Sequence, residues 1–182
     1  MSEFVVLERT PDPPIALEDV ERMDREAAWC MEHHRVRHST SLLSTDGRRL
    51  ICAFAAPDAE AVRNVLRQFE IVPARLWTAT EHGPPDHPVT APIARNGDEL
   101  VVVARAFDEP VELQAIQDIE DRGAWCLEQH RVRFVRTWFA RDRRAMLCLY
   151  AAPDAESVRT AQRRVGMPLT DVWSARLFLS GR

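Results

Sequence analysis

The chain has 182 residues, of which 46% are hydrophobic and 29% are charged, and its formal net charge is −4. This composition is typical of a folded globular protein with room for one or two small domains, and it excludes a largely disordered chain. The weak negative charge offers no general attraction for nucleic acid, so we expect no nucleic-acid partner.

The sequence lacks the segments that direct proteins into or across membranes. No apolar run reaches about 18 residues, and the first residues have neither the basic start nor the apolar stretch of a signal peptide. The four cysteines, Cys30, Cys52, Cys126 and Cys148, are too few and too dispersed for the disulfide framework of a small secreted domain. We therefore expect reduced thiols, no membrane partner and a cytoplasmic location.

The chain contains a tandem duplication. The string "AWCMEHHRVR" begins at residue 28 and "AWCLEQHRVR" at residue 124, and a shift of 96 positions aligns residues 4–80 with 100–176 without a gap. About a third of the aligned positions are identical, which indicates two copies of one structural unit. We predict a first domain over residues 1–81, a linker rich in proline and glycine over 82–99, and a second domain over 100–182.

In each copy the pattern predicts the order strand, helix, strand, strand, helix, strand. The first strands, "FVVLER" and "LVVVAR", are short apolar runs, and apolar residues at helical spacing follow over 20–34 and 116–130. The next two strands form a hairpin across "TDGR" in the first copy and "RDRR" in the second. Asp58 and Asp154 then cap a second helix, and the final strand contains Trp77 or Trp173.

This βαββαβ order predicts an α+β protein made of two tandem ferredoxin-like domains, each with a four-stranded antiparallel sheet and two helices on one face. Strands such as "LICAFAA" and "MLCLYAA" are apolar at odd and even positions alike, so both faces of each sheet should be covered. We therefore expect the two sheets to pack against each other as a pseudo-dimer that leaves room for a cleft.

The repeated string contains candidate metal ligands. Cys30 and His34 are four residues apart on a predicted helix and project to the same side, as do Cys126 and His130 in the second copy. Both pairs also lie on the apolar stripe of the helix, where packing in the core is the favoured interpretation and metal ligation is the alternative. Glu8, at the end of the first strand, is a further candidate ligand that occurs in the first copy only.

Basic and aromatic residues suggest a second kind of site. Arg37 and Arg133 follow the first helix of each copy and are candidates for binding an anionic group of a cofactor or ligand, although solvated arginines are commoner. Trp29 and Trp125 fall away from the apolar stripe, so we expect an exposed contact surface there or an indole folded back on its helix. The first copy is richer in donor groups, since His38 has no counterpart histidine in the second.

The stretches "STDGRRLICAFAAPDAEAVR" and "ARDRRAMLCLYAAPDAESVRTAQRRVGMP" resemble the signature of a bacterial domain-of-unknown-function family, the nickel-binding-protein-like ferredoxin-fold proteins. The resemblance covers both copies and implies a ferredoxin-like fold, dimer-like packing of the sheets, and binding of nickel or another divalent metal. The family often has a histidine in the second helix, where this chain has Val65 and Ala161. This difference removes one plausible metal ligand from each copy.

From these observations we expect a non-enzymatic binding protein that holds nickel, another divalent metal or a small ligand at or between the two domains. We expect binding rather than catalysis because the sequence has no glycine-rich phosphate loop, no nucleophile elbow and no Cys-x-x-Cys pair. Two alternatives remain open: a small-molecule enzyme of the dimeric α+β-barrel oxygenase or isomerase type, and a protein-interaction scaffold. Association of the chain with further copies of itself is also open.

Overall fold

The computed structural model describes residues 3–83 and 97–181, and these residues form two compact units. The first unit comprises the chain up to Thr80 together with Arg176–Arg182, and the second comprises Glu81–Ala175. Each unit therefore contains most of one sequence copy and the end of the last strand of the other. Most of the predicted linker, residues 82–99, lies outside the described residues.

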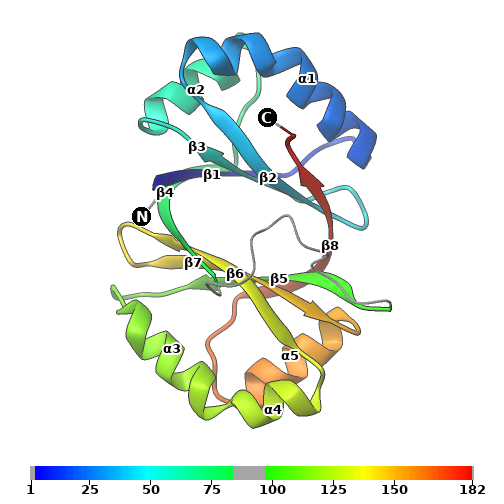
Figure 1. Ribbon diagram of the computed structural model, residues 1–182, viewed down its shortest axis with the longest axis vertical. Helices are drawn as coiled ribbons and strands as arrows, with labels where there is room; N and C mark the ends of the chain where they lie inside the picture. The colour runs from blue at the N-terminus through cyan, green and yellow to red at the C-terminus, as the bar shows by residue number, and fades with distance from the viewer. Residues whose placement is uncertain (1–2, 84–96, 182) are drawn as a thin grey trace. The chain divides into compact units, whose positions relative to one another are not determined.

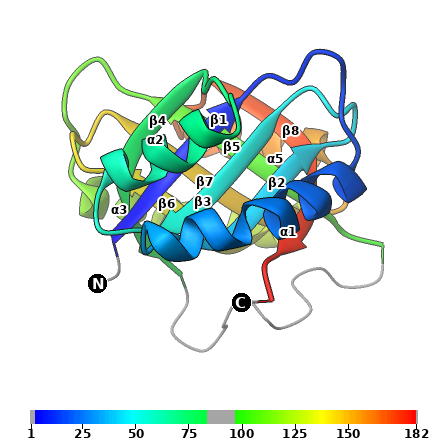
Figure 2. The same ribbon diagram turned by 90° about the horizontal axis from the view of Figure 1, so that it is seen from above.

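The first unit has the predicted order of strands and helices. Its elements are β1 (Glu3–Arg9), α1 (Leu17–His33), β2 (Arg37–Ser44), β3 (Leu50–Ala55), α2 (Ala59–Gln68) and β4 (Arg75–His82). The strands pair antiparallel in the order β4-β1-β3-β2, and the chain end continues beside β2, where Ser180 N donates to Ser39 O at 3.2 Å. Both helices lie side by side on one face of this sheet (Figure 1, Figure 2). The βαββαβ prediction is confirmed for this copy.

The turn between β2 and β3 explains the glycine of "TDGR". Gly47 has a φ of +70°, and a Cβ atom there would lie 2.2 Å from Ile15 O, so a larger residue would force a shift. Gly47 O also accepts a hydrogen bond from Ile15 N at 3.1 Å, which ties the segment before α1 to the hairpin. Helix α2 begins as predicted, because the Asp58 side chain accepts from Ala61 N at 2.8 Å.

The core of the first unit lies between the two helices and the sheet. Helix α1 contributes the buried side chains of Val20, Cys30 and Met31, which recur at helical spacing. Asp24 lies on the same stripe and is also buried. A carboxylate in such surroundings is costly unless it is paired and hydrogen-bonded, so Asp24 marks a polar site inside the core.

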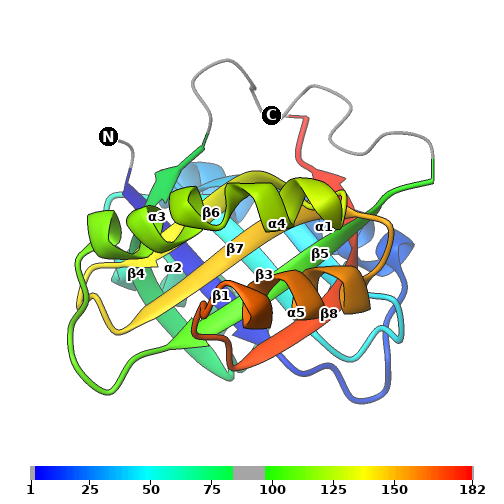
Figure 3. The same ribbon diagram turned by 90° about the horizontal axis from the view of Figure 1, so that it is seen from below.

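The second unit repeats this plan with one difference. Its elements are β5 (Glu99–Ala106), α3 (Leu113–Arg122), α4 (Ala124–Gln129), β6 (Arg133–Ala140), β7 (Ala145–Ala152), α5 (Ala155–Arg164) and β8 (Asp171–Leu179). The strands pair antiparallel in the order β8-β5-β7-β6, and the three helices cover one face of that sheet (Figure 3). None of the described helices in either unit is long and apolar enough to cross a membrane.

The prediction of a single long helix was wrong for the second copy, where α3 ends and α4 begins at Gly123. A Cβ atom on Gly123 would lie 2.4 Å from Cγ1 and 2.6 Å from Cβ of Val165, so the helix approaches the end of α5 more closely than any side chain would allow. Ala27 stands at the equivalent position of the unbroken helix α1. The contact with Val165 therefore requires glycine at the position where α3 ends and α4 begins.

Candidate functional site

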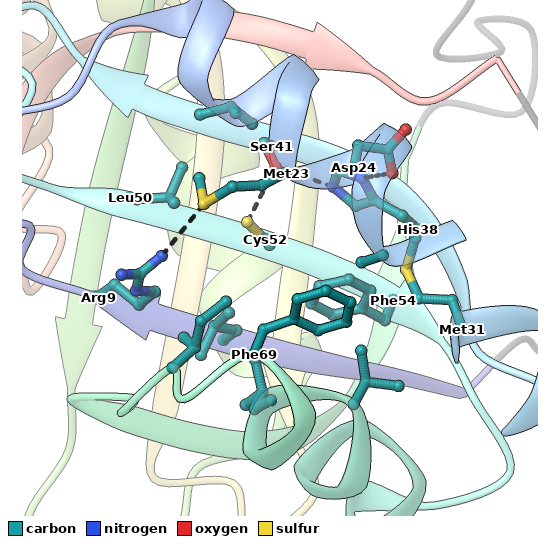
Figure 4. Close-up of a pocket in the computed structure, with 16 residues that line it drawn as sticks. Arg9, Met23, Asp24, Met31, His38, Ser41, Leu50, Cys52, Phe54 and Phe69 are labelled. Atoms are coloured by element: carbon teal, nitrogen blue, oxygen red, sulfur yellow. Dashed lines mark hydrogen bonds and ion pairs between the residues drawn. The ribbon is translucent and has the colours of Figure 1, made fainter. Parts of the chain in front are cut away.

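The first unit contains a partly open cavity of about 70 Å³ between its two helices and its sheet. Its walls are mostly apolar side chains from β1, α1, β3 and α2, including two methionines, Met23 and Met31. The charged groups stand at its ends: Figure 4 shows Arg9 on one side and His38 with Asp24 on the other. The cavity thus combines an apolar interior with two separated polar positions.

A chain of hydrogen bonds links three elements at the His38 end. Asp24 Oδ1 of α1 lies 2.7 Å from His38 Nδ1 of β2, and His38 Nε2 lies 2.8 Å from Ser41 Oγ. Ser41 Oγ in turn lies 2.9 Å from Cys52 Sγ of β3. Ser180 Oγ donates to the other Asp24 oxygen at 3.2 Å. All the polar atoms of the buried Asp24–His38 pair therefore have partners.

The charge of His38 decides what this cluster can do. Burial by itself lowers the pKa of His38, but the hydrogen bond to Asp24 and the electrostatic interactions with Asp24 and nearby Cys52 outweigh it and raise the pKa to about 9. At neutral pH the ring is then an imidazolium that donates to both Asp24 and Ser41. The order Ser41–His38–Asp24 is that of a hydrolytic triad, yet a protonated His38 has no lone pair with which to accept the Ser41 proton. The cluster acts as a fixed ion pair.

Arg9 is the polar group at the opposite end. Its side chain is half-buried, and its Nη1 points toward Met23 Sδ at 3.8 Å (Figure 4). Sulfur is a weak acceptor, and among the described residues no oxygen atom accepts a hydrogen bond from this guanidinium. Arg9 is therefore a cation at the cavity wall with its donors still available.

The equivalent place in the second unit is filled. Arg105, which aligns with Arg9, is only 2% exposed and donates to Pro168 O at 2.5 Å, Gln162 Oε1 at 2.9 Å and Tyr150 Oη at 3.1 Å. Tyr150 donates onward to Glu120 Oε1 at 2.8 Å. The remaining hollow has a volume of about 20 Å³. The space beside the aligned arginine thus differs between the copies. In the second unit the unit's own side chains fill it, and in the first unit it stays open.

The residues predicted as metal ligands do not converge. Glu8 accepts from Trp77 Nε1 at 2.6 Å and pairs with Arg75 at 3.5 Å, while Cys30 is buried and burial raises the pKa of its thiol. In the described part of the chain, no three His, Cys, Asp or Glu side chains are arranged to hold a metal ion. The described residues therefore offer single donors to a nickel ion but no complete ligand set, and nickel needs several ligands together.

His34 follows the end of α1 and His130 follows the end of α4, and Cys126 lies within α4. Each histidine follows the last helical residue, and its backbone N–H donates to the cysteine carbonyl four residues earlier at 3.1 Å. Cys126 is fully buried, and all four cysteines are free. His130 Nε2 is buried and has no hydrogen-bond partner in the described structure.

The predicted anion-binding arginines lie outside the cavity. Arg37 lines a larger, open hollow of about 760 Å³ together with Trp29 and Arg35, and this hollow shares His38 and Met31 with the cavity. Arg133 is half-buried at the equivalent place on β6.

Of the two alternatives for the indoles of the repeated string, the structure shows the exposed one. Trp29 and Trp125 are 61% and 59% exposed.

Sequence reasoning singled out His38 but missed Asp24, Ser41 and Arg9. A signal for Asp24 was available, because it is a charged residue on the apolar stripe of α1, four positions after Val20. No signal pointed to Arg9. An arginine at a strand end is ordinarily solvated, and only the packing of α1 over it places it at a cavity.

The family model described as "Nickel responsive protein SCO4226-like" matches residues 4–78 and 102–174, which lie in the two sequence copies. The chain belongs to this family. The resemblance noted in the sequence and the tandem duplication are thereby confirmed. No curated protein matches the chain in sequence.

Solved structures share the fold at low sequence identity. A putative chlorite dismutase is 12% identical with a TM-score of 0.54, and the match covers 98% of this chain and 95% of that chain. The chlorite dismutase from Candidatus Nitrospira defluvii, in complex with imidazole, is 9% identical with a TM-score of 0.54, covering 96% of this chain and 91% of that chain. These likenesses show that two βαββαβ halves build the fold of this chain, as predicted.

Proposed function

We propose that the protein is a non-enzymatic, cytoplasmic binding protein whose first unit holds a small organic molecule in the cavity between Arg9 and His38. The observation that supports this most strongly is the difference between the two copies. The same elements surround the same position in both, yet the second copy fills it with the Arg105 network and the first keeps about 70 Å³ open. Open space in a core costs packing energy, so retaining it favours a role in binding.

The chemistry at the His38 end supports binding over catalysis. Both ring nitrogens of His38 have partners, and its raised pKa of about 9 keeps the ring protonated at neutral pH. A general base needs a pKa close to the working pH, which this histidine lacks. The Asp24–His38 pair is better suited to fixing the position of α1 over β2, and thus the shape of the cavity.

The test is a titration of the ¹⁵N-labelled chain with pentanamide, a neutral molecule with a short apolar tail, followed by NMR. Amide signals of cavity-lining residues such as Leu7, Cys52 and Phe54 are expected to shift in a saturable manner. The variant Ala27→Leu extends a side chain into the cavity and is expected to abolish these shifts. Glu26→Leu, on the exposed face of the same helix, is the matched control and should bind as the unaltered chain does. Equal binding by all three proteins would reject the proposed site.

A second candidate is binding of a divalent metal ion at His130. It is supported by the description of the family as nickel responsive and by the buried His130 Nε2 without a partner. Calorimetric titration with nickel tests it, using His130→Ala and the first-copy equivalent His34→Ala. Binding that His130→Ala alone removes would support a site there, whereas unchanged heats in both variants would exclude the two histidines as ligands.

A further inference from the structure

We infer that the ligand of the first-unit cavity is a small monocarboxylate, with its carboxylate paired to Arg9 and a short aliphatic tail in the apolar interior. This rests on the proposed binding function and adds the chemical class of the ligand. The observation behind it is that Arg9 lacks the acceptors that its counterpart Arg105 has.

Two of the three acceptors of Arg105 are side chains, and their absence around Arg9 can be traced to two substitutions between the copies. Arg105 donates to Tyr150 Oη and Gln162 Oε1, and the residues that align with these two are Phe54 and Leu66, which have no polar side-chain atom. Both Phe54 and Leu66 line the cavity. Arg9 therefore faces apolar side chains at the places where Arg105 finds oxygen atoms.

Among the described side chains of the first unit, no carboxylate takes the place of those acceptors. Asp24 is the only acidic residue among the described side chains that line the cavity, and it is already bound to His38 and Ser180. Glu8, the neighbour of Arg9 in β1, is bound to Trp77 and Arg75. Since Asp24 and protonated His38 cancel in charge, Arg9 leaves the cavity with one unbalanced positive charge.

A carboxylate is the group that best satisfies this position. Its two oxygens accept two parallel hydrogen bonds from a guanidinium, and such charge-assisted bonds are stronger than neutral ones. Desolvation of a half-buried guanidinium without acceptors is unfavourable, and an anionic ligand would remove that penalty.

The cavity also limits the size of the tail. Its volume of about 70 Å³ is roughly half of the ~150 Å³ that accommodates benzene in an apolar protein cavity, so a tail of about four carbons is the expected upper size. Met23 and Met31 in its wall have flexible, unbranched side chains that can adjust to a ligand. Pentanoate fits this description and is isosteric with the neutral pentanamide.

The experiment compares pentanoate with pentanamide by NMR titration of the intact chain and of Arg9→Gln. We expect the unaltered chain to bind pentanoate about tenfold more tightly than pentanamide, because only the anion forms the bidentate pair. In Arg9→Gln the preference for pentanoate should disappear while pentanamide still binds. Arg75→Gln, which alters an exposed arginine of the same sheet, is the control and should keep the preference.

A second variant, Phe54→Tyr with Leu66→Gln, transfers the second-unit acceptors to the first unit. The introduced hydroxyl and amide oxygens should accept hydrogen bonds from Arg9 and weaken pentanoate binding about tenfold or more. Thermal unfolding is used to confirm that the variant chain is folded. If pentanamide binds at the cavity but pentanoate binds no better, the inference about Arg9 is overturned and the proposed binding function stands. If neither molecule shifts the cavity signals, both are overturned.

Discussion

Asp24 and His38 depend on each other for their place in the core. Phe134 occupies the position of His38 in the second copy, so the variant His38→Phe should fit the space, yet it leaves the buried Asp24 carboxylate without its cationic partner. Breaking a buried pair by removing one member costs about 3–5 kcal/mol. We expect a loss of that size in urea unfolding, and recovery of most of it in the double variant Asp24→Leu, His38→Phe. A single variant as stable as the unaltered chain would show that the pair is not ionic.

The Asp24–His38 pair should also make the free energy of unfolding fall as the pH becomes alkaline. The pKa of His38 is about 9 in the folded chain and 6.5 when unperturbed, so the folded state holds its proton more tightly. Its contribution is fully present below pH 6.5 and is lost as the pH rises through 9. The polar groups near the ring are Asp24 from α1, Ser41 from β2 and Cys52 from β3, and Asp24 and Cys52 are the ionisable ones among them.

Relative to His38→Phe, we expect the free energy of unfolding to fall by about 3 kcal/mol across this interval, since one pKa unit corresponds to about 1.4 kcal/mol. Urea unfolding at a series of pH values measures the effect. A parallel pH profile in the two proteins would contradict the assignment of the proton to His38.

At the scale of elements, much of the fold follows from local pattern. The strands, the hairpin turns and the caps at Asp58 and Asp154 were predictable because each depends on residues close together in the sequence. The close contact of Gly123 with Val165, at the break between α3 and α4, was not predictable, because Val165 reaches Gly123 from the end of another helix. The cavity was missed for a similar reason, since it is assembled from side chains of several elements.

The variant Gly123→Ala tests the explanation of that break. The added methyl group would overlap Val165, so we expect a loss of about 1–3 kcal/mol despite the better helix propensity of alanine. Combining it with Val165→Ala removes the overlap and should recover part of the loss in thermal unfolding. If Gly123→Ala raised the stability instead, helix propensity would outweigh the contact and the break would need another cause.

For the whole molecule, the tandem duplication alone would predict two ligand sites, one at Arg9 and one at Arg105. The contacts of these two arginines predict a site at Arg9 only. Each copy brings an arginine at the end of its first strand under its first helix, yet Arg105 is already bound to Gln162 and Tyr150, whereas Arg9 is not. A ligand entering the second unit would have to break at least two of those hydrogen bonds, each worth about 1.5–3 kcal/mol when a charged group takes part. We therefore expect one pentanoate per chain, with shifted NMR signals confined to the first unit. Calorimetry supplies the stoichiometry independently, and two equivalent binding events per chain would mean that the Arg105 network opens at little cost.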